Sequence, residues 1–138
     1  MKIETQCLLL PSSIGSFDAD FLGSGVYALS PRGATKFYTG ATLTKFLELP
    51  YSHRILKVEL KHTDNADADS TDSWSYQIRR QGIWDLFNTL RSGTAVTVSD
   101  VLETFDDSFV SGATIYRIYC TQTTAADRIY PTFFVEIL

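Results

Sequence analysis

Residues 53–62, which read HRILKVELKH, decide the fold class of this 138-residue chain. Leu56, Val58 and Leu60 recur at every second position, and charged residues stand at the positions between them. A period of two with one polar side is typical of a strand in an antiparallel sheet that has one wet face. We therefore expect a long strand here and an antiparallel β protein around it.

The partner of this strand is expected at residues 73–80, where Trp74, Tyr76 and Ile78 alternate with polar side chains. Ten residues separate the two segments, and four of them are aspartates. Two alternating runs joined in this way indicate a hairpin with a long loop.

Further strands are predicted where alternating or apolar runs lie between turn signals. They are Lys2–Leu10, Gly25–Leu29, Thr35–Thr39, Thr42–Leu49, Thr94–Val98, Thr114–Cys120 and Ile129–Leu138. Residues 11–24 are rich in Ser, Gly and Asp and are expected to form a loop anchored by Phe17 and Phe21.

One helical pattern interrupts the strands. Ile83, Leu86, Phe87 and Leu90 have the spacing of one helix face, which predicts a short helix near 83–91. Residues 100–103 fit either a capped helical turn or a bent strand. About eight strands without strand–helix alternation favour a single all-β domain over 1–138, an antiparallel, jelly-roll-like β-sandwich, with a closed barrel as the alternative.

Composition and charge narrow the classes of partner. The net charge is −4, and the longest basic run is the pair Arg79–Arg80, so nucleic acid is not an expected partner. No apolar run is long enough for a membrane helix. The first ten residues carry too short an apolar stretch for a signal peptide, so we expect synthesis and retention in a cytoplasm, or assembly there into a particle released by lysis.

The acidic loop is the sharpest local motif. Asp64, Asp67, Asp69 and Asp72 offer carboxylates that could converge on Ca²⁺. The calcium-loop pattern needs a glycine at its sixth position and an acid at its twelfth, and neither possible register supplies them. We interpret this loop as a solvated hairpin tip and assign no metal and no cofactor.

Catalytic patterns are weak. His53 and His62 lie about 30 Å apart on one strand, so they cannot share a metal or a proton within one subunit. Cys7 and Cys120 fit buried free thiols better than a disulfide. No nucleophile motif is present. Glu103, Asp106 and Asp107 could supply a pair of carboxylates for glycoside cleavage, but we interpret them as solvated loop residues.

The last predicted strand is apolar on both sides, with Phe133 and Val135 on one face and Tyr130, Phe134 and Leu138 on the other. Both faces must then be covered, and a second subunit is a plausible second cover. The predicted strand before it, Thr114–Cys120, adds three residues on its outward face: Ile115, Arg117 and Tyr119. We therefore propose as interface residues Ile115, Arg117, Tyr119, Tyr130, Phe133, Phe134, Val135 and Leu138.

The pattern over residues 40–138 resembles small β-sandwich virion proteins of tailed bacteriophages, such as capsid decoration, head-fibre and tail accessory subunits. The resemblance rests on residues 49–60, LPYSHRILKVEL, opening a long hairpin, on Ser/Thr-rich strands, on the absence of a signal peptide and on a final strand that ends the chain. It implies a non-enzymatic assembly protein of the virion that binds itself and other virion proteins, with no small-molecule substrate.

Two other hypotheses remain. The first is a lectin-like, carbohydrate-binding module that stacks sugars on Trp74 or Trp84 and uses calcium in the acidic loop. The second is a small cupin-like or barrel enzyme, which the lack of a histidine cluster disfavours.

Overall fold

The computed structural model describes residues 13–14, 17–32, 42–63, 73–81, 87–96, 100–122 and 128–137. Ten strands run through these residues: β1 (Ser13–Ile14), β2 (Phe17–Gly23), β3 (Val26–Pro31), β4 (Thr42–Leu49), β5 (His53–Thr63), β6 (Ser73–Gln81), β7 (Phe87–Val96), β8 (Val101–Thr104), β9 (Thr114–Gln122) and β10 (Arg128–Ile137). The predicted all-β class is confirmed.

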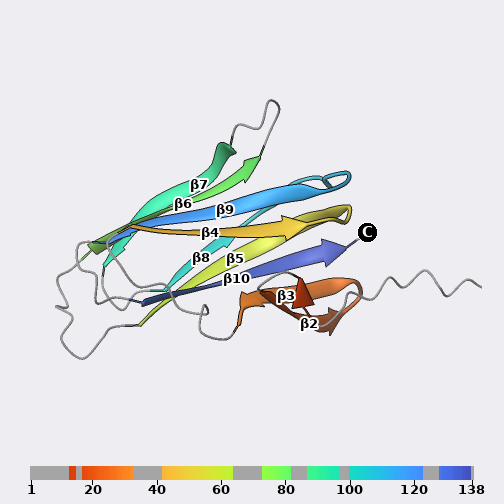
Figure 1. Ribbon diagram of the computed structural model, residues 1–138, viewed down its shortest axis with the longest axis horizontal. Coiled ribbons are helices and arrows are strands. Elements are labelled where there is room, and N and C mark those ends of the chain that lie inside the picture. Colours follow the sequence, from red (N-terminus) through yellow and green to blue (C-terminus); the bar gives the residue numbers. More distant parts are fainter. Residues whose placement is uncertain are drawn as a thin grey trace, which may run out of the picture.

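The strands form two sheets that face each other (Figure 1). One has six strands in the order β1-β2-β3-β10-β5-β8, and the other has four in the order β4-β9-β6-β7. Every pairing within them is antiparallel. The architecture is the expected sandwich and not a closed barrel.

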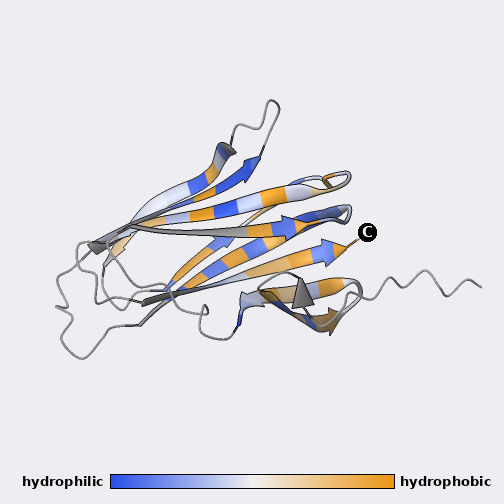
Figure 2. Ribbon diagram, in the orientation of Figure 1, coloured by the Kyte–Doolittle hydropathy of each residue, from blue (hydrophilic) through white to orange (hydrophobic). Residues whose placement is uncertain are grey.

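Hydrophobic residues, coloured orange in Figure 2, recur along the strands of both sheets. The core fills the space between the sheets and is built from apolar residues of both. Phe133 of β10 lies at its centre, with its ring centroid 6.2 Å from that of Phe17 and 6.0 Å from that of Tyr116. The largest fully buried side chains are Trp74, Tyr27, Tyr116, Phe17, Phe133, Leu29, Leu47, Leu49, Leu60, Ile78 and Ile118.

The alternation expected along 53–62 holds at Val58 and Leu60, which are both fully buried. It is wrong at Leu56. The pairing with β10 steps from Lys57 to Ile55, so Leu56 is the extra residue of a β-bulge. Because a bulge reverses the phase of a strand, Ile55 enters the core and Leu56 is only half-buried.

The helix predicted near 83–91 is wrong over residues 87–91, which belong to β7, and residues 82–86 lie outside the described part. Strand β7 pairs with β6, and the register skips Leu90 between Thr89 and Arg91. This bulge breaks the period of two at Leu90, so the position of Leu90 does not follow regular strand alternation. Ladder hydrogen bonds to β6 override that local pattern.

The loop expected at 11–24 contains strand β2, and the ambiguous segment at 100–103 is largely strand β8. Phe17 is buried as predicted, whereas Phe21 is half-exposed. The β2–β3 hairpin closes through Ser24 and Gly25, which both have positive φ. Two such residues in a two-residue hairpin turn match type I′, whose twist suits the strands on either side.

Candidate functional site

A buried polar cluster joins the two sheets at one end of the sandwich. Nδ1 of His53 in β5 lies 2.7 Å from the carbonyl oxygen of Tyr51, and its Nε2 lies 2.7 Å from the hydroxyl of Tyr116 in β9. Because a carbonyl only accepts, Nδ1 carries the proton, and Nε2 of the neutral ring accepts from Tyr116. The positive charge of Arg80 in β6 acts on both side chains.

Burial sets the protonation of this cluster. It lowers the pKa of His53 below 6.5, the hydrogen bond that His53 donates to the Tyr51 carbonyl opposes this shift, and the nearby Arg80 charge adds to it. Burial also raises the pKa of Tyr116, and the Arg80 guanidinium offsets part of that rise. His53 and Tyr116 have no exposed surface, so these two side chains tie the sheets together and are not accessible to a substrate.

A second polar pair links the sheets at their open edge. The Tyr76 hydroxyl of β6 donates to Glu103 of β8. Burial, followed by this hydrogen bond and the Glu103 charge, raises the pKa of Tyr76 to about 12. Glu103 therefore accepts a structural hydrogen bond, while Asp106 is exposed and Asp107 half-buried in the segment after β8.

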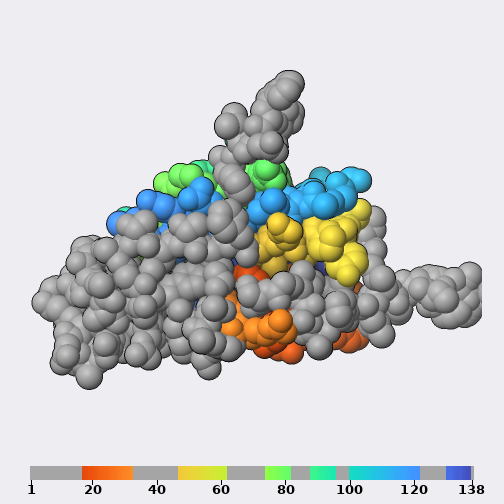
Figure 3. Space-filling view, viewed as in Figure 1, coloured from red at the N-terminus to blue at the C-terminus, as the bar shows by residue number. Residues whose placement is uncertain are grey.

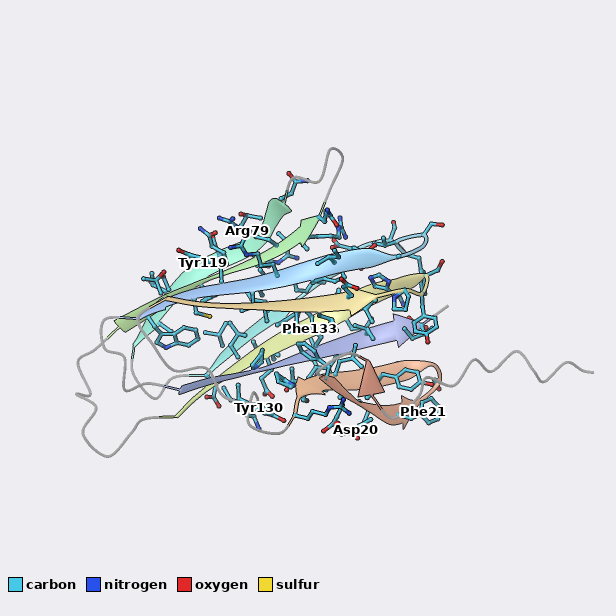
Figure 4. The ribbon with its side chains drawn as sticks, viewed as in Figure 1. Asp20, Phe21, Arg79, Tyr119, Tyr130 and Phe133 are labelled. Atoms are coloured by element: carbon cyan, nitrogen blue, oxygen red, sulfur yellow. The ribbon has the colours of Figure 1, made fainter. Side chains whose placement is uncertain are left out.

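Large exposed apolar side chains gather at the end of the sandwich that holds His53. Phe21 is 52% exposed, Leu22 56% and Phe109 37%. We call these three residues the apolar tip. Figure 4 labels Phe21 close to the β2–β3 turn, and Figure 3 shows the same face in space-filling form.

Backbone hydrogen bonds explain why the tip residues share one end. Ile137 donates to the Gly25 carbonyl over 2.8 Å, and His53 and Val110 exchange bonds of 3.0 and 2.6 Å. Ile137 and His53 are themselves partners in the β10–β5 ladder. One row therefore runs across the sheet from the β2–β3 turn to the segment that carries Phe109, a span of about 15 Å at 4.8 Å per strand.

A hollow of about 220 Å³ opens beside this end, between the end of β4 at Leu49 and the start of β9 at Thr114. Pro50, Ala113 and Ile115 contribute apolar atoms to its wall. The hollow offers room for a side chain from a partner.

The predicted interface residues separate into four groups. Ile115, Arg117 and Tyr119 are half-buried on β9, at positions that alternate with core residues, so they lie on the outer face of the four-stranded sheet. Tyr130 and Phe134 are half-buried on β10. Leu138 lies outside the described residues.

Phe133 and Val135, also proposed as interface residues, belong to the core instead. They are 1% and 0% exposed because the four-stranded sheet covers their side of β10. On the other side of β10, Lys57 partly covers Phe134, with its Nζ 4.5 Å from the ring centroid. The chain itself therefore supplies part of the second cover that was expected from another subunit.

The remaining candidates are the sugar-stacking tryptophans, the two cysteines and the acidic loop. Trp74 is 2% exposed and cannot stack on a sugar, so the proposed role in carbohydrate binding is wrong for this residue. Cys120 is a buried free thiol whose pKa burial raises to about 12. Cys7, Trp84 and the acidic loop with Asp64, Asp67, Asp69 and Asp72 are not among the described residues.

The apolar tip was not found from the sequence. Phe21 and Leu22 stand in a segment read as a loop, and Phe109 stands in an irregular segment 87 positions later. The available signal was the pair Phe21–Leu22 directly before Gly23, two large apolar residues at a turn where polar ones are usual.

No protein-family model matches the chain, and no curated protein matches it either. Among the described residues, no three His, Cys, Asp or Glu side chains are grouped as a metal site would require. None of the described segments is a helix that could cross a membrane.

Proposed function

We propose that this chain is a non-enzymatic structural protein that assembles by protein–protein contact through its apolar tip. The observation that supports this proposal concerns the four large hydrophobic side chains that are exposed in the described part. Three of them lie at one end of the sandwich. Apolar groups gathered on a soluble surface mark an interaction site more often than scattered ones do.

The expected strength of one contact follows from the exposed area. Full burial of a Phe or Leu side chain contributes about 1.5–3 kcal/mol, and the exposed half of each tip residue contributes on the order of 1 kcal/mol. Such a contact is weak when it occurs once. Repeated contacts in an assembly reinforce one another through high effective concentration.

The resemblance to small phage virion proteins supports the same role and extends the proposal to a virion subunit. In that setting the partners are further copies of this chain and other virion proteins. The chain would be synthesised in the host cytoplasm and act within the particle.

Sedimentation velocity over a wide concentration range tests the assembly role. The wild type is expected to self-associate at high concentration. A Phe21→Ser, Leu22→Ser double variant and a Phe109→Ser variant should each weaken association at least tenfold, because polar side chains remove the apolar contact.

Leu102→Ser is the matched control. Leu102 is 55% exposed on β8 but pairs with Glu59, about 20 Å along the strand from His53. Its replacement should leave association unchanged. A 15.5 kDa monomer at every concentration, or equal weakening by Leu102→Ser, would contradict assembly through the tip.

A further inference from the structure

Two arginines lie directly opposite each other on the outer face of the four-stranded sheet. Arg79 of β6 pairs with Arg117 of β9, and in the next outward pair Gln77 lies opposite Tyr119. Like charges in directly opposed cross-strand positions repel each other and destabilise a sheet. An anion bound between the two guanidinium groups would remove that repulsion.

Both cations lie against the ring of Tyr119. The Cζ atoms of Arg79 and Arg117 are each 5.7 Å from its ring centroid, within the range of a cation–π contact. In Figure 4, Arg79 and Tyr119 appear near each other on this sheet. The aromatic ring thus gathers both positive groups at one place.

The charge of Arg79 has no carboxylate partner among the described residues. Its Nη2 donates to the Gln77 side chain, while its Nε is shielded from water and meets no acceptor in the described part. Three cations on or beside the six-stranded sheet have carboxylate partners: Arg54 with Glu136 at 2.8 Å, Lys61 with Glu59 at 3.9 Å and Arg32 with Asp18 at 3.9 Å.

A hollow of about 300 Å³ lies over the neighbouring outward pairs of this sheet, and its lining includes Gln77 and Tyr119, the pair next to the two arginines. Hydroxyl and amide side chains surround it together with Tyr119, namely Ser75, Gln77, Ser92, Thr94 and Thr121. This volume is at the lower end of ligand sites, which span about 300–1,000 Å³. It suits one ring-sized polar ligand that offers several hydroxyl groups.

We infer that this face binds an acidic saccharide, with the sugar carboxylate held by Arg79 and Arg117 and the sugar ring lying in the hydroxyl-lined hollow beside Tyr119. A guanidinium fork matches a planar carboxylate with two parallel hydrogen bonds. Ser, Thr and Gln side chains both donate and accept, as sugar hydroxyls require. This site is separate from the apolar tip and does not depend on assembly.

The charge distribution favours a saccharide over a long polyanion. Nucleic acids need many basic groups along a track, and this chain has a net charge of −4. A patch of two arginines beside a hydroxyl-lined hollow fits a single carboxylate attached to a polar ring.

The test measures binding of the full chain to oligosaccharides that end in glucuronic acid or sialic acid, and to matched oligosaccharides with neutral ends. Isothermal titration gives the affinities, and amide shifts in NMR spectra locate the site. The acidic sugars should bind at least tenfold more tightly than the neutral ones, with shifts on β6, β7 and β9.

Arg79→Gln should weaken this binding at least tenfold, and Arg79→Lys should weaken it less because the charge remains. Gln77→Glu is a second test variant. It should also weaken binding, because a carboxylate at the hollow repels the acidic sugar. Lys61→Gln removes one charge from the six-stranded sheet, and its affinity should equal that of the wild type. Unchanged NMR spectra elsewhere verify that each variant folds.

Three results would overturn the inference: no binding of acidic sugars at millimolar concentration, equal binding of neutral sugars, or full affinity in folded Arg79→Gln. Binding of a poly-glutamate peptide or inorganic phosphate at this face in place of the sugars would overturn the saccharide assignment as well.

Discussion

His53 is a polar side chain that is fully buried between the two sheets. Both ring nitrogens are engaged, by Tyr51 on one side and Tyr116 on the other, and the neutral ring satisfies both bonds with one tautomer. Protonation would place a second proton on Nε2, against the Tyr116 hydroxyl, in a site that already faces the Arg80 charge. The folded state therefore disfavours the imidazolium form.

This preference predicts a pH dependence of stability. The unfolded histidine protonates near pH 6.5, while the lowered pKa of folded His53 keeps the ring neutral to lower pH. The unfolded state then binds more protons between these two values, so the free energy of unfolding should decrease as the pH falls below about 6.5.

Urea denaturation between pH 8 and pH 5 measures this effect. A His53→Asn variant should be less stable throughout, because it leaves Tyr116 without its acceptor, and it should lose the part of the slope due to His53. His62 and the carboxylates are common to both proteins. An identical slope in the variant would show that His53 does not titrate in this way.

The open edge between β7 and β8 shows at the element scale how a missing side chain shapes a contact. Gly93 of β7 pairs with Tyr76 of β6, and a Cβ atom at Gly93 would lie 2.6 Å from the Tyr76 hydroxyl oxygen. The absence of a side chain lets the Tyr76 ring cross β7 and reach Glu103 on the other sheet.

Gly93→Ala should therefore destabilise the protein by about 1–3 kcal/mol, the usual cost of overpacking. The hydroxyl makes the closest contact and the ring carbon Cζ follows at 2.9 Å, so Tyr76→Phe should relieve part of the penalty of the alanine when the two changes are combined. Chemical denaturation of the two single variants and the double variant gives the coupling. If the losses in the free energy of unfolding of the two single variants add up exactly in the double variant, the strain of Gly93→Ala does not come from contact with the Tyr76 hydroxyl.

The elements that could be predicted from the sequence are those whose alternation is regular. Strands β6 and β9 and most of β5 have side chains that face inward and outward in strict turn. Strand β7 was misread because its bulge at Leu90 breaks the period. Strand β2 was missed because Asp18, Asp20 and the glycines around it are typical of loops, and its pairing with β3 decides its conformation.

The candidate sites depend on contacts between distant segments, so their composition could be predicted only in part. Ile115, Arg117 and Tyr119 were assigned to an outward face correctly, because that follows from strand period alone. The opposition of Arg117 to Arg79 depends on the register between β9 and β6, and no local pattern encodes it.

The two proposed roles, assembly and ligand binding, belong to different surfaces of the molecule. The outer face of the six-stranded sheet carries paired charges, the four-stranded sheet carries the arginine pair and a hydroxyl-lined hollow, and one end carries the apolar tip. A rigid sandwich keeps these surfaces at fixed positions. Assembly through the end leaves the face of the four-stranded sheet available for a ligand.

Hydrogen–deuterium exchange of the wild type at low and high concentration tests the assembly claim most directly, because it locates the buried surface. Raising the concentration should slow exchange in peptides that cover the β2–β3 turn, residues 21–25, and the segment 105–113. Peptides from β6 and β7 should exchange at the same rate in both samples. Protection confined to β6 and β7, or no protection at any concentration, would contradict assembly through the apolar tip.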